Sequence, residues 1–258
     1  MSNSTADKLI FLGTGTSQGV PVITCDCEVC RSADNKNKRL RTSLYVHVQG
    51  VDMVIDAGPD FRTQMLANAI QNIDCILQTH EHQDHTGGLD DVRPFNHKNQ
   101  KPLDLFGEKR CLQAIRREYA YIFRKKKYPG APEIMLHEIH AKPFVFNGIE
   151  IEPIRVKHWN LPIFGFKIGN WAYITDASYI AAKEMKKLQN LDILIINALQ
   201  HKPHYSHFTL AQALEVIAKL QPKRAYLTHI SHRLDYRIEQ EKLPPNVSFA
   251  YDGLTIPL

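Results

Sequence analysis

The stretch ILQTHEHQDHTGGL, Ile76–Leu89, places four potential metal ligands directly after an apolar run. His80 and His82 are two residues apart, so in an extended segment their side chains point to the same face and can bind one ion. If a helix then begins, Asp84 and His85 lie at a neighbouring position and can bind a second ion. Sites of this kind keep coordination positions open for water. A capping aspartate beside incidental surface histidines is the alternative interpretation.

Composition indicates an ordinary globular protein with a large core. The chain has 258 residues, 43% of them hydrophobic and 23% charged. A formal net charge of +5 permits steering of anionic substrates and does not single out nucleic acid, whereas thirteen histidines favour metal binding. The N-terminus lacks a secretory pattern, and no apolar run approaches the ~20 residues of a membrane span. We therefore expect a cytoplasmic protein that does not enter a membrane.

Strand-like and helix-like segments form two blocks along the chain. Residues rich in β-branched and aromatic types predict strands at 8–13, 42–48, 51–60 (ending in a turn at Gly58-Pro59), 74–79, 191–197 and 224–229, with short strands and turns over 144–158 and 164–176. Helices are predicted at 61–70, 108–123, 180–189 and 209–220. Two packed sheets covered by outer helices fit this order. Since no long linker is visible, we expect a single domain over residues 1–258.

THEHQDHTGG resembles the signature of the metallo-β-lactamase-fold metallohydrolases. The family order continues with His158 in VKHWN, Asp176 in AYITDAS and His229 in YLTHIS. The resemblance implies an α+β fold, a four-layer αββα sandwich. It also implies a dinuclear site, whose ligands are His80, His82 and His158 for the first ion, Asp84, His85 and His229 for the second, and Asp176 as the bridging carboxylate. Asp56 in VIDAG matches a position that supports a ligand through a hydrogen bond, although a turn aspartate is the alternative.

CDCEVC gathers Cys25, Cys27 and Cys30 in a Cys-rich loop near residues 25–30. Closely spaced thiols in a cytosolic protein indicate soft-metal binding, and a closed zinc site needs a fourth nitrogen or sulfur ligand. His232, three residues beyond His229, is our candidate for that ligand. A reduced cluster without metal is the alternative.

The Cys cluster, the H-x-x-H of LTHISH and the lead-in GTGTSQGVP at 13–21 together resemble the PhnP-like cyclic phosphodiesterases of phosphonate metabolism. This resemblance implies that His207 contacts the phosphate or the leaving oxygen, where it can donate a proton or a hydrogen bond. His204 matches a position of less defined role, and His201 is interpreted as a surface residue. We expect a dinuclear metal-dependent hydrolase that cleaves a small cyclic phosphate or nucleotide-like phosphodiester by attack of a metal-bound hydroxide, with Asp84 and His207 as catalytic residues. The cofactors are then two zinc or manganese ions and one structural zinc, and the resemblance also suggests a homodimer.

Other functions remain as alternatives. A tRNA 3′-processing endonuclease shares the fold and ligands, but no Gly-rich arm for tRNA is visible, so nucleic acid is not the favoured partner. A lactonase or thioester hydrolase ranks lower, and a non-catalytic zinc-stabilised binding protein is the non-enzymatic alternative. The basic run Arg124–Gly130 is interpreted as a solvated loop, with a phosphate-attracting lid as the alternative.

Overall fold

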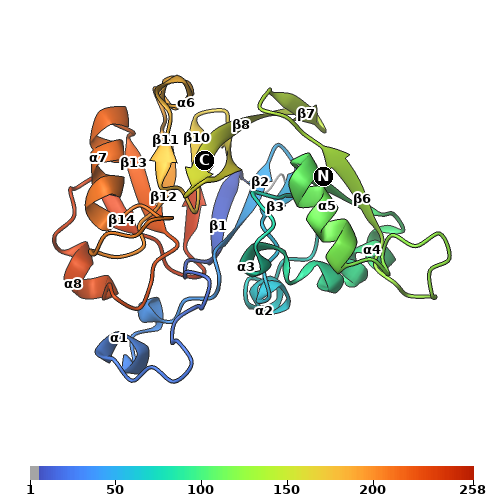
Figure 1. Cartoon of the computed structure of the whole chain (residues 1–258), viewed down its shortest axis with the longest axis horizontal. Coiled ribbons are helices and arrows are strands. Elements are labelled where there is room, and N and C mark those ends of the chain that lie inside the picture. The colour runs from blue at the N-terminus through green and yellow to red at the C-terminus, as the bar shows by residue number, and fades with distance from the viewer. Residues whose placement is uncertain (1–5) are drawn as a thin grey trace. The chain divides into compact units, whose positions relative to one another are not determined.

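The protein, described here by a computed structural model over residues 6–258, divides into two compact units (Figure 1). In the described residues, the first unit contains residues 6–13, 43–140 and 253–258, and the second contains residues 14–42 and 141–252. Each unit builds its own sheet, of seven strands in the first and eight in the second within residues 6–258. Our expectation of a single domain stays a prediction.

The sheet of the first unit has the strand order β15-β1-β2-β3-β4-β5-β6. Strands β15, β1, β2 and β3 pair antiparallel, and β3 to β6 pair parallel. Parallel strands buried on both faces read as apolar runs, and β4 (CIL) is fully buried. The bounds are Lys8–Gly13 (β1), Ser43–Val48 (β2), Val51–Ile55 (β3), Cys75–Leu77 (β4), Leu103–Gly107 (β5), Ile134–Glu138 (β6) and Thr255–Pro257 (β15).

Helices of the first unit pack on this sheet through apolar faces. Leu112 and Ile115 of α5 are buried in one cluster with Ile76 and Leu105 of the strands. The predicted helix at 108–123 ends five residues early, because Tyr119 leaves helical geometry and its hydroxyl donates to the carbonyl of Thr86. The bounds are Phe61–Ala67 (α2), Gln83–Thr86 (α3), Leu89–Val92 (η2, a 3-10 helix), Arg93–Asn99 (α4) and Lys109–Glu118 (α5).

The sheet of the second unit has the order β11-β8-β9-β10-β12-β13-β14, with β7 paired to β8. Strands β10, β12, β13 and β14 are parallel, and β8, β9 and β10 are antiparallel. Their bounds are Phe144–Phe146 (β7), Ile149–His158 (β8), Leu161–Ile168 (β9), Trp171–Ile174 (β10), Tyr179–Ile180 (β11), Ile193–Asn197 (β12), Arg224–Thr228 (β13) and Val247–Phe249 (β14).

Helix α7 covers the parallel part of this second sheet. Thr209 and Gln212 form a capping box that fixes where the helix begins, and this box lies shortly after His207. Val216 and Ile217 then pack against the strands, and Figure 1 shows α7 beside β13. The helices of this unit are Glu28–Arg31 (α1), Asn35–Asn37 (η1, a 3-10 helix), Ala182–Lys187 (α6), Leu210–Leu220 (α7) and Tyr236–Gln240 (α8). Nowhere in residues 6–258 is a helix both long and apolar enough to cross a membrane.

Candidate metal centre

The first unit gathers four predicted ligands after β4. The imidazole centroid of His80 lies 4.6 Å from that of His82 and 4.2 Å from that of His85. Oδ2 of Asp84 lies 3.3 Å from Nε2 of His85. Helix α3 begins at Gln83, as the sequence suggested, and its first turn therefore carries Asp84 and His85. His80 and His85 are fully buried, whereas His82 is exposed.

Asp56 holds this loop from the end of β3. Its Oδ1 accepts hydrogen bonds from Nε2 of Gln78 and from the backbone N–H of Thr79, each at 2.8 Å. Its Oδ2 lies 2.8 Å from Oγ1 of Thr79 and 2.7 Å from Nδ1 of His85. Burial raises the pKa of Asp56, while His85 and the N–H and O–H donors act against that rise. With Nδ1–H of His85 donated to a carboxylate, Nε2 carries the lone pair, as in most metal-binding histidines.

Gln78 and Thr79 support the site, although no motif in the sequence marks them. Besides Asp56, Nε2 of Gln78 donates to the carbonyl oxygens of His80 at 3.1 Å and His85 at 3.0 Å. Both polar side chains are buried at the end of an apolar strand. Buried polar residues must find partners, so their position after the CIL run was the available signal.

The second unit brings together the other four residues of the predicted site, which are three histidines and one aspartate. Oδ1 of Asp176 lies 3.1 Å from Nε2 of His229 and 3.6 Å from Nδ1 of His207. The ring centroid of His207 is 4.7 Å from that of His158 and 4.7 Å from that of His229. Nδ1 of His158 lies 2.9 Å from each of the carbonyl oxygens of Asp176 and Ser206, so it donates there and leaves the lone pair on Nε2.

Three of the site's residues have left-handed backbone geometry within two residues of the end of a strand. The φ angles are 64° for Asp56, 56° for Asp176 and 54° for His229, where a non-glycine residue is uncommon. Such backbone strain is concentrated at functional sites, and the observed outliers therefore point to function. Each of the three follows a strand whose hydrogen bonds fix its direction.

His207 is buried between charged and ionisable groups. Burial and, to a smaller extent, the neighbouring His229 lower its pKa to about 2, while Asp176 acts to raise it. The ring is therefore neutral near pH 7 and has one N–H to donate. His204 also has a pKa lowered by burial, and its Nδ1 lies 3.0 Å from Oγ of Ser206. His201 is exposed, and its Nε2 lies 3.1 Å from Oε1 of Glu239.

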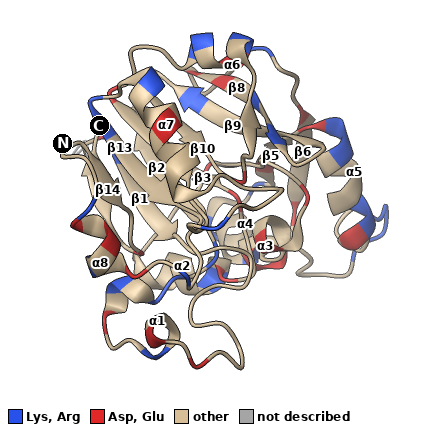
Figure 2. Cartoon of the chain, turned by 60° about the vertical axis from the view of Figure 1, so that its left-hand side comes forward, with Lys and Arg blue, Asp and Glu red and all other residues tan. Residues whose placement is uncertain are grey.

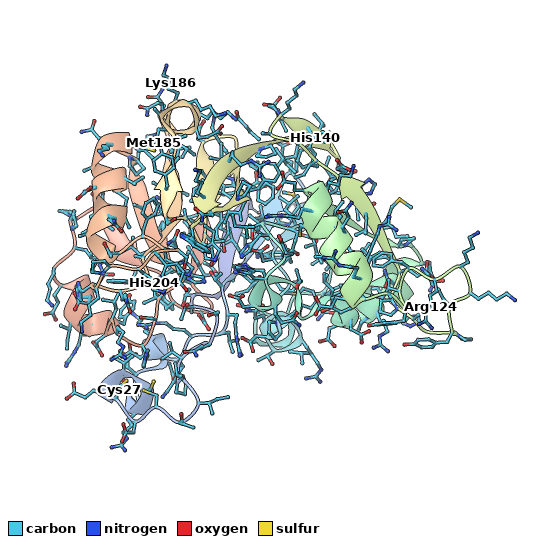
Figure 3. The ribbon with its side chains drawn as sticks, viewed as in Figure 1. Cys27, Arg124, His140, Met185, Lys186 and His204 are labelled. Atoms are coloured by element: carbon cyan, nitrogen blue, oxygen red, sulfur yellow. The ribbon has the colours of Figure 1, made fainter. Side chains whose placement is uncertain are left out.

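The Cys-rich loop and His232 converge within the second unit. The Sγ atoms of Cys25, Cys27 and Cys30 lie 3.2, 3.5 and 3.6 Å from Nδ1 of His232. In a tetrahedral zinc site with usual bond lengths, sulfur and nitrogen ligands are separated by about 3.5 Å. The four side chains thus fit a closed zinc site, and Figure 3 shows Cys27 next to α1, where the sulfur atoms gather.

The basic run Arg124–Gly130 is exposed along its length in the first unit. Figure 2 shows Lys and Arg positions on α5 and on the segment that follows it. Ala131 closes a turn by donating its backbone N–H to the carbonyl of Tyr128. Together with side chains of α4, Gly130 lines a hollow of about 180 Å³. The exposure agrees with a solvated loop.

A family model described as the beta-lactamase superfamily domain matches residues 52–230, which include every predicted ligand of the dinuclear site. The chain belongs to the beta-lactamase superfamily. A solved structure described as a new diphosphatase from the PhnP family is 38% identical, with a TM-score of 0.92 and 98% of each chain covered. The metallo-β-lactamase fold and the PhnP resemblance predicted from the motifs are therefore confirmed. Zn²⁺-bound PqqB from Methylobacterium extorquens, 18% identical with a TM-score of 0.80 over 97% of this chain and 100% of that chain, shares the fold.

A second relative of this chain is named for a different activity from that of the diphosphatase. A protein of Porphyromonas gingivalis named octanoyltransferase is 43% identical over 251 residues, which are 96% of this chain and 51% of that protein. The chain thus spans about half the length of this relative. Human tRNase Z, short form, is 20% identical with a TM-score of 0.69, covers 96% of this chain and 98% of that chain, and shares the fold.

Proposed function

We propose that this protein is a metal-dependent phosphodiesterase that hydrolyses a small cyclic phosphate or a nucleotide-like phosphodiester. The observation that carries the proposal is the pair of tethered imidazoles: Nδ1 of His85 donates to Asp56 and Nδ1 of His158 donates to backbone carbonyls. This arrangement orients imidazoles for metal binding and raises their basicity. The diphosphatase of the PhnP family, 38% identical over nearly the whole chain, supports phosphoryl chemistry.

The proposed ligand sets follow the superfamily order. His80, His82 and His158 would bind one divalent ion, and Asp84, His85 and His229 would bind the other, with Asp176 shared between them. Imidazoles combined with carboxylates suit zinc or manganese. When bound, a pair of such ions supplies an activated water and stabilises charge on the phosphoryl oxygens.

The protein's own side chains would then position the reactants. His207 would donate its single N–H to a phosphoryl or leaving-group oxygen, and the contacts of its ring with those of His158 and His229 would hold it in orientation. Asp84 would accept a hydrogen bond from the attacking water. His207 lies two residues before Thr209, the N-cap of α7, so the start of the helix fixes its backbone.

We further propose that Cys25, Cys27, Cys30 and His232 hold a structural zinc. His232 is three residues beyond His229, so a zinc at this cluster would fix the segment that carries a ligand of the catalytic pair. The N–S separations of 3.2–3.6 Å support this assignment.

Acyl chemistry is the second candidate function, because the relative from Porphyromonas gingivalis is named octanoyltransferase. That name belongs to a protein about twice the matched length. Acyl transfer through a thiol needs an accessible thiolate, but Cys75 and Cys111 are fully buried, and burial raises the pKa of both. The remaining three thiols face His232 in the proposed zinc site. Phosphodiester hydrolysis therefore ranks first.

The deciding experiment is a substrate panel on zinc- or manganese-loaded protein, with His82→Ala as the ligand variant and His201→Ala as a surface-histidine control. The panel contains adenosine 2′,3′-cyclic phosphate, bis(p-nitrophenyl) phosphate, a dinucleoside diphosphate, precursor tRNA and an octanoyl thioester. We expect diester hydrolysis that His82→Ala abolishes and His201→Ala retains. Octanoyl thioester turnover without diester hydrolysis, or cleavage of precursor tRNA alone, would replace the proposal. Bound metal with no turnover at all would support the non-catalytic binding protein.

A further inference from the structure

Three aromatic side chains form an exposed corner beside the His158–His207 cluster of the second unit. Trp159 directly follows His158, and His204 and Tyr205 precede His207 in the loop before α7. Trp159 is 58% exposed and Tyr205 is 72% exposed, which is unusual for large rings that can pack inside. We call Trp159, His204 and Tyr205 the aromatic corner; His204 is labelled in Figure 3.

The rings of the aromatic corner support one another. The centroids of Trp159 and Tyr205 are 5.7 Å apart with their planes at 74°, an edge-to-face pair. His204 stacks on Tyr205 at 4.7 Å with the planes at 20°. Because two ring faces meet almost at a right angle, a third planar ring can stack on one of them while its edge contacts the other.

Trp159 has a strained backbone conformation and an exposed ring. His158 pairs with Leu161 across the β8–β9 hairpin, so Trp159 and Asn160 form a two-residue turn. Trp159 has φ of 54°, a geometry that such turns usually assign to Gly, Asn or Asp. Its backbone N–H donates to Oγ of Ser178 at 3.0 Å, which fixes the turn. Strained backbone is found mainly at functional sites. The strained conformation of a bulky residue with an exposed ring therefore points to a contact between the ring and a ligand.

The aromatic corner is continuous with the proposed catalytic residues. The His204 centroid lies 5.1 Å from that of His207, which in turn lies 4.7 Å from that of His158. One ring, that of His204, therefore separates Tyr205 from His207, so a group stacked on Tyr205 lies close to the residue proposed to contact the phosphate.

We propose that the aromatic corner binds a planar aromatic group of the substrate, such as a nucleobase, and thereby selects base-bearing phosphodiesters over base-less ones. The inference rests on the proposed function and names its substrate class. Stacking on aromatic side chains accepts every base, because each base has a π-face, so we expect preference for a base and little discrimination among bases.

Binding can be measured without turnover, on metal-loaded protein. Trp159 is one of two tryptophans, and the other, Trp171, is 4% exposed, so quenching by a stacked base reports on Trp159. We expect AMP to quench the fluorescence and ribose 5-phosphate to leave it unchanged. Calorimetry should show AMP binding weakened about tenfold or more by Trp159→Ala and by Tyr205→Ala, and restored by Trp159→Phe. Ile238→Ala, which removes an exposed apolar side chain of α8, is the matched control.

Turnover gives the second readout. The ratio of kcat/KM for adenosine 2′,3′-cyclic phosphate to that for glycerol 1,2-cyclic phosphate should fall about tenfold in Trp159→Ala, through KM. Equal binding of AMP and ribose 5-phosphate, or an unchanged ratio in the variant, would overturn the inference while leaving the hydrolase proposal intact. Base-dependent AMP binding without hydrolysis of any diester would support the aromatic corner and contradict the proposed function.

Discussion

Nδ1 of His85 lies 2.7 Å from Oδ2 of Asp56, and both side chains are fully buried in the first unit. The carboxylate accepts two hydrogen bonds from Thr79 and one from Gln78 as well, so its position is set by the chain around it. This pair couples the end of β3 to the first turn of α3, where the proposed ligands Asp84 and His85 lie.

Asp56→Asn should therefore weaken metal binding without removing a ligand. The amide has the size of the carboxylate, but it places an N–H group where a carboxylate oxygen accepts hydrogen bonds. Loss of a carboxylate that supports a metal-binding histidine typically lowers metal affinity about 10–100-fold. Competition against a chromophoric chelator measures the affinity. Glu118→Gln, at an exposed carboxylate of α5, is the control. Unchanged affinity in Asp56→Asn would show that the pair is not part of a metal centre.

Cys30→Ser and His232→Ala should each remove one zinc per chain and lower the Tm, because a structural zinc contributes to folding free energy. Elemental analysis and thermal unfolding measure the two effects. Cys111→Ala removes a buried thiol outside the cluster and should keep the zinc content. If the Cys30 and His232 variants retained the zinc of the wild type, the four side chains would form a reduced cluster without metal.

His207→Ala should lower kcat about 10²–10³-fold, the usual cost of removing one hydrogen-bond donor to a developing anionic oxygen. His207→Gln keeps a neutral N–H donor and should recover part of the loss. Steady-state kinetics on a phosphodiester with a poor leaving group is the most sensitive assay. The metal content of each variant is measured in parallel. Activity of His207→Ala equal to that of the wild type would exclude a role for this ring.

Much of the fold could be predicted because it depends on local sequence, and the assignment of the metal ligands stays a prediction. The H-x-H-x-D-H motif follows a buried strand, and several β-branched residues mark each of β3, β8 and β12. The strands β5 and β6 and the helix α4 were not predicted, and neither were β14 and β15, which are too short to show a periodicity of their own. The roles of Gln78 and of Tyr205 depend on contacts between distant segments, which no spacing in the sequence encodes.

Replacement of Arg124, Lys125, Lys126 and Lys127 with glutamine should leave KM for anionic substrates unchanged, because all four side chains are exposed and solvated. Steady-state kinetics at low ionic strength tests this, since screening is weakest there. A KM that rises several-fold in the substituted protein and converges with the wild type at high salt would establish the loop as a phosphate-attracting lid.

We propose that the two ligand sets hold a pair of divalent ions. Crystallography of the zinc-loaded protein, with anomalous diffraction recorded on both sides of the zinc edge, locates such ions. We expect two neighbouring peaks, one bound by His80, His82 and His158, the other by Asp84, His85 and His229, with Asp176 a ligand of both. Anomalous peaks confined to Cys25, Cys27, Cys30 and His232, with none at these histidines, would contradict it.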